Sequence, residues 1–139
     1  MAWQTPTLNW NAQNYFNYSD FNRAENNTVY VSALLNAQGY INALNTTITN
    51  RTNVNLDFYD SLNRIEANIL SLQQSLGYVP TGWITPVTAW TYDLPFDYNT
   101  ANRWEQDVNL IYTTINNIVT EYIYCGAVNA ICGEDQTYL

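Results

Sequence analysis

The sequence predicts an all-α protein, a small helical bundle built from three related units of about 40 residues each, joined by extended segments that contain Trp and Pro. Two observations predict this fold. The tetrapeptide Asn-Arg-x-Glu occurs at residues 22–25, 63–66 and 102–105, at nearly equal spacing. After each copy, apolar residues recur at alternating steps of three and four, which is the spacing of one helix face. Because a repeated helix cannot bury its apolar face alone, neighbouring units or neighbouring subunits are expected to cover it.

A second motif joins the outer two units. The pattern W-x-T-P-x-x-x-W occurs at residues 3–10 and again at residues 83–90, and this offset equals the one between the first and third Asn-Arg-x-Glu. The middle unit has ALNTTITN where the Trp-Pro motif is expected, which indicates a degenerate or trimmed copy. Agreement in phase between two separate patterns indicates internal duplication.

The chain is predicted to form one domain, 1–139. Its expected internal divisions are units 1–40, 41–78 and 79–126 and a C-terminal tail 127–139. Helices are expected near residues 20–37, 60–76 and 100–124, with a shorter one around 40–48. Residues 78–96 contain three prolines and are expected to be extended and wrapped over the helices.

Each predicted helix has one apolar face, which is expected to form the core. These core positions are Phe21, Ala24, Thr28, Val31 and Leu35 in the first helix, Leu62, Ile65, Ile69, Leu72 and Leu76 in the second, and Ala101, Trp104, Val108, Ile111, Ile115 and Ile118 in the third. Helix caps are expected at Ser19 or Asp20, at Asp60, and at Asn99 or Thr100.

Composition excludes several functions. Four Arg and no Lys stand against 12 acidic residues, which gives a net charge of -8 and argues against a nucleic-acid partner. The chain contains no His, and its two cysteines, Cys125 and Cys132, are expected to be free thiols, with a disulfide as the alternative. No catalytic residue, metal site or cofactor is therefore predicted. No signal peptide or membrane span is expected.

The Asn-Arg-x-Glu motif offers an amide, a guanidinium and a carboxylate in each unit. Arg and Glu two positions apart on a helix point in different directions, so they are not expected to form a catalytic pair within one unit. The motif is instead predicted to fix the start of each helix and its packing on the next unit. Its residues are Asn22, Arg23, Glu25, Asn63, Arg64, Glu66, Asn102, Arg103 and Glu105.

The aromatic residues around the Trp-Pro segments have two interpretations. Aromatic faces stack on sugar rings, which is typical of a carbohydrate-binding surface. Thr-Pro also favours an extended chain that paired Trp side chains pin to a helical groove, and this anchoring role is the favoured one. The residues predicted to dock the chain on neighbouring subunits are Trp3, Pro6, Trp10, Tyr15, Phe16, Trp83, Pro86 and Trp90.

The N-terminal motifs resemble those of a known group of proteins. The patterns W-Q-T-P at residues 3–6, Y-F-N at 15–17 and D-F-N-R-x-E at 20–25 resemble a segment of virion and tail-associated proteins of phages and prophages from Gram-positive bacteria. That segment commonly reads W-x-T-P-K-T-D-W, then D-Y-F-N, then D-Y-N-R-I-x-x-N. The match extends from the N-terminus to about Leu35, whereas Thr7 and Asn9 replace the Lys and Asp of that group.

The resemblance implies a non-enzymatic structural protein of a phage or phage-like particle, assembled in the host cytoplasm and located in the virion. Its expected partners are other proteins and copies of itself. A glycan-binding or receptor-recognition module that uses exposed Trp, Tyr and Asn is the alternative. An acidic hydrolase is a third hypothesis. It requires two carboxylates that converge in a cleft.

Overall fold

A computed structural model describes residues 2–54 and 57–127, with side chains described as far as residue 119. Within these ranges it contains three helices and no strand: α1 (Tyr18–Ala37), α2 (Tyr59–Leu76) and α3 (Tyr98–Ala127). Every helix packs against the other two. The predicted small helical bundle is therefore confirmed. Nearly all of the predicted tail 127–139 and the side chains of both cysteines lie outside this description.

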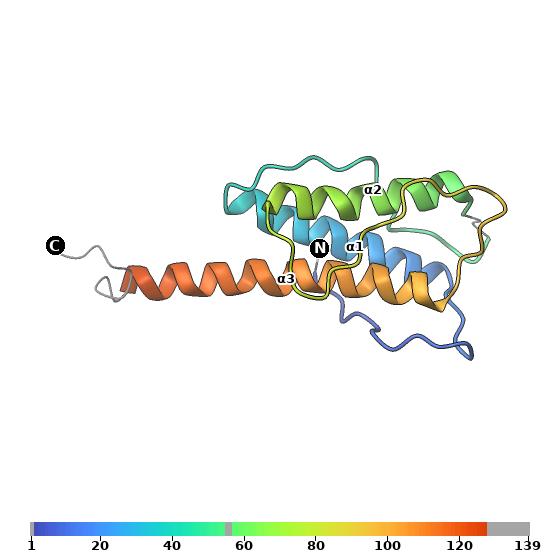
Figure 1. Cartoon of the computed structure of the whole chain (residues 1–139), viewed down its shortest axis with the longest axis horizontal. Helices are drawn as coiled ribbons and strands as arrows, with labels where there is room; N and C mark the ends of the chain where they lie inside the picture. The colour runs from blue at the N-terminus through green and yellow to red at the C-terminus, as the bar shows by residue number, and fades with distance from the viewer. Residues whose placement is uncertain (1, 55–56, 128–139) are drawn as a thin grey trace.

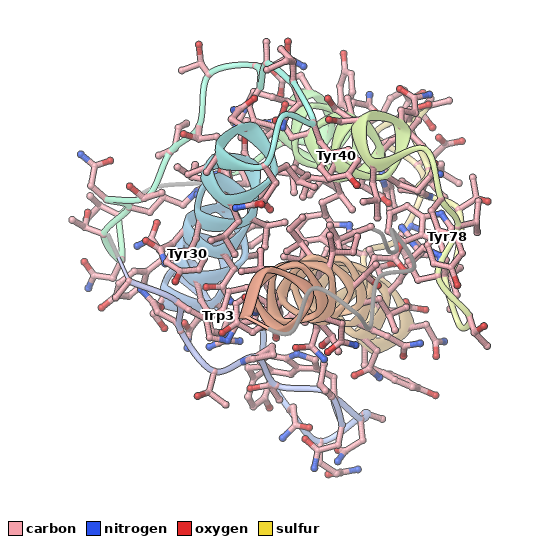
Figure 2. The ribbon with its side chains drawn as sticks, turned by 90° about the vertical axis from the view of Figure 1, so that its left-hand side faces the viewer. Trp3, Tyr30, Tyr40 and Tyr78 are labelled. Atoms are coloured by element: carbon pink, nitrogen blue, oxygen red, sulfur yellow. The ribbon has the colours of Figure 1, made fainter. Side chains whose placement is uncertain are left out.

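The three helices run in the same direction (Figure 1). Each helix begins at the same end of the bundle, and an extended segment returns the chain to that end after α1 and again after α2. Seen end-on, the helices lie at the corners of a triangle, and the extended segments lie on the outside (Figure 2). Short loops usually make consecutive helices of a bundle antiparallel. The long return segments permit a parallel arrangement with approximate threefold symmetry.

The predicted apolar faces form the core. The buried cluster contains Ala24, Val31 and Leu35 of α1, Ile65, Ile69, Leu72 and Leu76 of α2, and Trp104, Val108, Ile111 and Ile115 of α3, with Phe21, Leu62 and Ile118 partly buried against it. The predicted core position Thr28 is also buried, and its hydroxyl donates to the carbonyl oxygen of Ala24 (2.8 Å). A polar side chain thus occupies a core position without an unsatisfied donor.

Side-chain volumes compensate between neighbouring core layers. Directly before the motif Asn, α1 has the large Phe21 where α3 has Ala101. One turn later the order is reversed, because α1 has Ala24 where α3 has the buried Trp104. Alternation of large and small residues across facing positions fills a core without voids. The first and third units therefore fill the same two core positions with side chains of different size.

The helices begin slightly earlier than predicted, and the expected caps are wrong. Asn17 caps α1: its side chain accepts from the N–H of Ser19, while Asp20 accepts from the N–H of Asn17. Phe58 occupies the cap position of α2 and makes no side-chain capping bond. Before α3, Asp97 accepts from the N–H of Thr100 (3.1 Å). The capping position stands at the same distance before the motif Asn in all three units.

The short helix expected around residues 40–48 does not form, and this stretch is extended. Residues 46–49 are all β-branched, which disfavours a helix. Its main-chain groups bond side chains of the neighbouring helices instead.

Among the described residues, no helix combines the length and apolarity needed to cross a membrane.

Candidate functional site

The extended stretches are named here arm 1 (residues 2–17), arm 2 (residues 38–54) and arm 3 (residues 77–97). The Asn-Arg-x-Glu motifs lie where these arms cross the helices. The structure brings the three motifs together. Their Arg and Glu residues contact one another, and their Asn residues bind the arms.

The motif arginines and glutamates form a closed ring of ion pairs. Each Arg contacts the Glu of another helix, in cyclic order around the bundle. The pairs are Arg23–Glu105 (2.6 Å), Arg103–Glu66 (2.6 Å) and Arg64–Glu25 (2.5 Å). All three carboxylates are at most 2% exposed. Buried pairs of this kind specify geometry more reliably than they add stability, so we assign the ring a role in setting helix order and register.

Arg23 makes an additional contact within its own helix. Its guanidinium lies 2.9 Å from Asp20, as their spacing on the helix predicts. The pKa of Arg23 is raised above its ordinary value, mainly by the hydrogen bond to Glu105. The guanidinium is thus held charged between two helices and is not available as a proton donor.

The motif asparagines hold the arms. Each side-chain amide accepts from the main-chain N–H of one arm residue and donates to the carbonyl oxygen of the same residue. Asn102 holds Trp10, Asn22 holds Arg51, and Asn63 holds Trp90. The residue held lies at the same distance before the next motif Asn in every unit. Each arm therefore packs on the helix of another unit.

The side chains of the arm residues that these asparagines bind form hydrogen bonds or ion pairs with the glutamates of the ion-pair ring. The indole Nε1 of Trp10 donates to Glu105 (2.7 Å), and that of Trp90 donates to Glu66. In the middle unit Arg51 replaces Trp and pairs with Glu25 (2.5 Å). Sequence reasoning missed Arg51, although aligning the units on their motif Asn places it at the position of the two tryptophans. In the middle unit, Arg51 thus makes the contact to a buried glutamate that Trp makes in the other two units.

A second clamp fastens each arm to the helix that follows it. Asn27 accepts from the N–H of Gln4 (2.9 Å) and donates to the carbonyl oxygen of that residue (2.7 Å). Asn68 makes the same two bonds to Asn45 (2.8 and 3.3 Å). In the third unit the equivalent position is Asp107. Each arm therefore bridges two helices, with one clamp on each.

The predicted docking residues divide into internal and exposed groups. Trp10 and Trp90 are 9% and 6% exposed, and Pro86 is also buried. Trp3, Pro6, Phe16 and Trp83 are partly buried. Tyr15, by contrast, is 89% exposed. Within the single chain, the buried tryptophans pin extended segments to helices.

Trp3 illustrates this internal packing. Its ring stacks on Tyr112 of α3 with a centroid separation of 3.7 Å and an interplanar angle of 4°. Tyr30 of α1 packs against the same ring pair at 6.1 Å. Figure 2 places Trp3 between α1 and α3. The start of arm 1 therefore covers the groove between the first and last helices.

Three exposed tyrosines stand at the end of the bundle where the helices begin. Tyr18, Tyr59 and Tyr98 are the first residues of α1, α2 and α3, and they are 42%, 48% and 42% exposed. With the units aligned on the motif Asn, only five positions carry one residue type in all three: Thr, Tyr, Asn, Arg and Glu. The Asn, Arg and Glu positions build the clamps and the ring of ion pairs, whereas the three Tyr side chains are exposed at the end of the bundle. We call these three residues the tyrosine rim.

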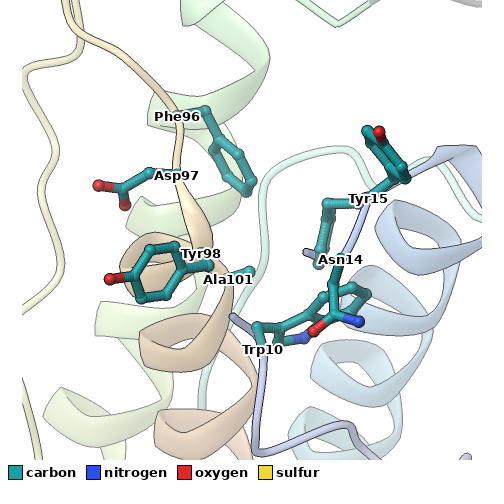
Figure 3. Close-up of a pocket in the computed structure, with 8 residues that line it drawn as sticks. Trp10, Asn14, Tyr15, Phe96, Asp97, Tyr98 and Ala101 are labelled. Carbon is teal, nitrogen blue, oxygen red and sulfur yellow. The ribbon is translucent and has the colours of Figure 1, made fainter. Parts of the chain in front are cut away.

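A pocket of about 190 Å³ opens at the same end, between arm 1 and the start of α3 (Figure 3). It is lined by Trp10, Asn14, Tyr15, Phe16, Phe96, Asp97, Tyr98 and Ala101. Figure 3 shows Tyr15 and Asp97 pointing away from the space between the two segments. Sites for small molecules are typically about 300–1,000 Å³. This pocket is therefore of a size for one side chain or one sugar ring.

No known family, curated protein or solved structure matches this chain. Across the described ranges there is also no group of three or more residues that could hold a metal ion.

Proposed function

We propose that the protein is a non-enzymatic structural protein of a phage or phage-like particle, which assembles in the host cytoplasm and docks on neighbouring subunits in the virion. The observation that carries this proposal is the tyrosine rim beside the pocket: one exposed residue type at equivalent positions of three parallel helices. Tyr supplies a large, rigid contact area at low cost in conformational entropy, and it is enriched at protein interfaces. The N-terminal resemblance to virion proteins supports the same function.

The internal contacts also support a structural role. The motif carboxylates and guanidiniums are saturated by one another and by the arms, so they hold the bundle in one arrangement. Because Trp10 packs on its own chain, we place the docking surface at the tyrosine rim and Tyr15 and not at that indole. Partners in this proposal are other particle proteins and copies of this chain.

The test is the mass of the native assembly. We expect the wild-type protein to form oligomers at high concentration, and a variant with Tyr18, Tyr59 and Tyr98 replaced by Ala to stay monomeric. Alanine has the highest helix propensity of all residues, so the substitutions should leave the helical circular dichroism unchanged. Tyr78→Ala is the matched control, because Tyr78 is exposed shortly after the last residue of α2. A wild-type protein that stays monomeric at every concentration contradicts self-association.

A glycan-binding module is the second candidate function. The aromatic lining of the pocket, with the amide of Asn14 at its edge, favours this candidate, because sugar rings stack on aromatic faces and bond amides. Binding on a glycan array that is lost in Asn14→Ala would establish it. The proposed docking role predicts no binding on such an array.

A further inference from the structure

The three clamps between an arm and its following helix are chemically unequal. Asn27 and Asn68 each use both halves of an amide: Oδ1 accepts the arm N–H, and Nδ2 donates to the arm carbonyl oxygen. A carboxylate accepts hydrogen bonds but has no hydrogen to donate. The third clamp, at Asp107, therefore matches the other two only when its carboxyl group carries a proton.

The contacts of Asp107 fit that requirement. Its Oδ1 accepts from the N–H of Ile84 (3.0 Å), as the two asparagines do in their units. Its other oxygen, Oδ2, which replaces the amide nitrogen of the two asparagines, is buried and has no hydrogen-bond partner. Asp107 as a whole is only 1% exposed. A buried carboxylate oxygen without a partner is costly in the ionised form.

We propose that Asp107 is protonated in the closed bundle and that its Oδ2–H donates to the carbonyl oxygen of Ile84, so that loss of this proton loosens arm 3 from α3. On either side of this point, arm 3 keeps a bond from the Gln106 side chain to the carbonyl oxygen of Gly82 (3.1 Å) and a bond from the N–H of Val87 to Glu66 (2.9 Å). Release at Asp107 is therefore a local opening around residues 82–87.

The surroundings of Asp107 set the pH at which the proton is lost. Burial raises its pKa from 3.8 to about 7. The N–H of Ile84 and the charge of Arg103 on the same helix lower the pKa, while Glu66 on α2 raises it. Arg103 is itself paired with Glu66, so the two charges act on the pKa of Asp107 in opposite directions.

The sign of the pH effect follows from the raised pKa. Between about pH 4 and pH 7 the folded chain holds this proton more tightly than the unfolded chain, so this group makes folding less favourable as the pH rises through that range. Above the folded pKa of about 7 the loss is complete. Arm 3 is then closed in mild acid and loosened in mild alkali.

The experiment compares wild type with Asp107→Asn in the full chain. We expect the substitution to raise Tm by about 5 °C at pH 8.5 and to leave it almost unchanged at pH 5, because Asn supplies the missing donor. At pH 8.5, amide hydrogen exchange in residues 82–87 should be about 10-fold slower in the variant than in wild type. Comparison at equal pH cancels the intrinsic pH dependence of exchange.

Two further variants keep the test decisive. Asn68→Asp should transfer the same pH dependence to arm 2, with faster exchange around residue 45 at pH 8.5. Asp93→Asn, at an exposed carboxylate, is the matched control and should change neither profile. An equal Tm difference between wild type and Asp107→Asn at both pH values would overturn the proposal. So would an Asp107 carboxyl signal in NMR that is fully ionised at pH 5.

Discussion

Replacing Glu66 by alanine is expected to lower the free energy of unfolding by about 3–5 kcal/mol, the cost of removing one partner from a buried ion pair. Glu66 is fully buried and accepts from Arg103, from the indole of Trp90 and from the N–H of Val87. The substitution leaves a guanidinium and two N–H donors without an acceptor. It therefore weakens both the contact between α2 and α3 and the anchor of arm 3.

Urea unfolding followed by circular dichroism measures this effect. The control is Asp60→Ala on the same helix, because Asp60 is exposed in the first turn of α2. Loss of a favourable helix-dipole interaction there should cost about 1 kcal/mol or less. A Glu66→Ala variant no less stable than this control would mean that the ion-pair ring does not hold the helices together.

Replacing Trp10 by alanine is expected to cost about 3–5 kcal/mol, which is typical of removing a buried Trp side chain. Trp10 packs against Phe16 with ring centroids 5.1 Å apart, and its Nε1 donates to Glu105. Without the indole, Glu105 retains Arg23, but the pocket beside Phe16 loses one wall. Arm 1 should detach from α3 while the three helices persist.

Limited proteolysis measures the detachment of arm 1, and urea unfolding measures the loss of stability. Limited proteolysis should cut the Trp10→Ala variant within residues 2–17 far faster than wild type, and urea unfolding gives the loss of stability. Tyr15→Ala is the control, since that ring is 89% exposed. If the Trp10→Ala chain is as resistant and as stable as the control, the Trp anchors have no structural role. Insertion of Trp3 and Trp10 into a neighbouring subunit would then be favoured.

The helices and their apolar faces were predictable because both depend on local periodicity. The steps of three and four around Ile69 and Ile111 identify the core side of α2 and α3 without knowledge of their neighbours. The parallel direction was not predictable in the same way. It depends on arms long enough to return the chain to the starting end and on bonds between residues as distant as Trp10 and Asn102.

The candidate site was predictable only in part. The spacing of Asn-Arg-x-Glu indicated packing between units, but it did not identify which Arg pairs with which Glu. The pairing depends on the order of the three helices around the bundle axis, which the spacing does not contain. Arg51 was missed because a guanidinium and an indole share little as residue types, although both donate an N–H to a buried carboxylate. The tyrosine rim was missed although Tyr recurs four residues before the motif Asn in every unit, because that spacing alone does not show that the three rings are exposed at one end of the bundle.

The cyclic pairing also bears on the order in which the chain folds. Arg64 and Glu25 are 39 residues apart and Arg103 and Glu66 are 37 apart, whereas Arg23 and Glu105 are separated by 82. Closing the longest loop has the largest entropic cost, so the first two contacts are expected to form before the third. During synthesis, the surface of α1 that packs on α3 therefore stays uncovered until residue 105 has left the ribosome. We expect the closing of the contact between α1 and α3, which arm 1 covers, to be the slowest step of folding.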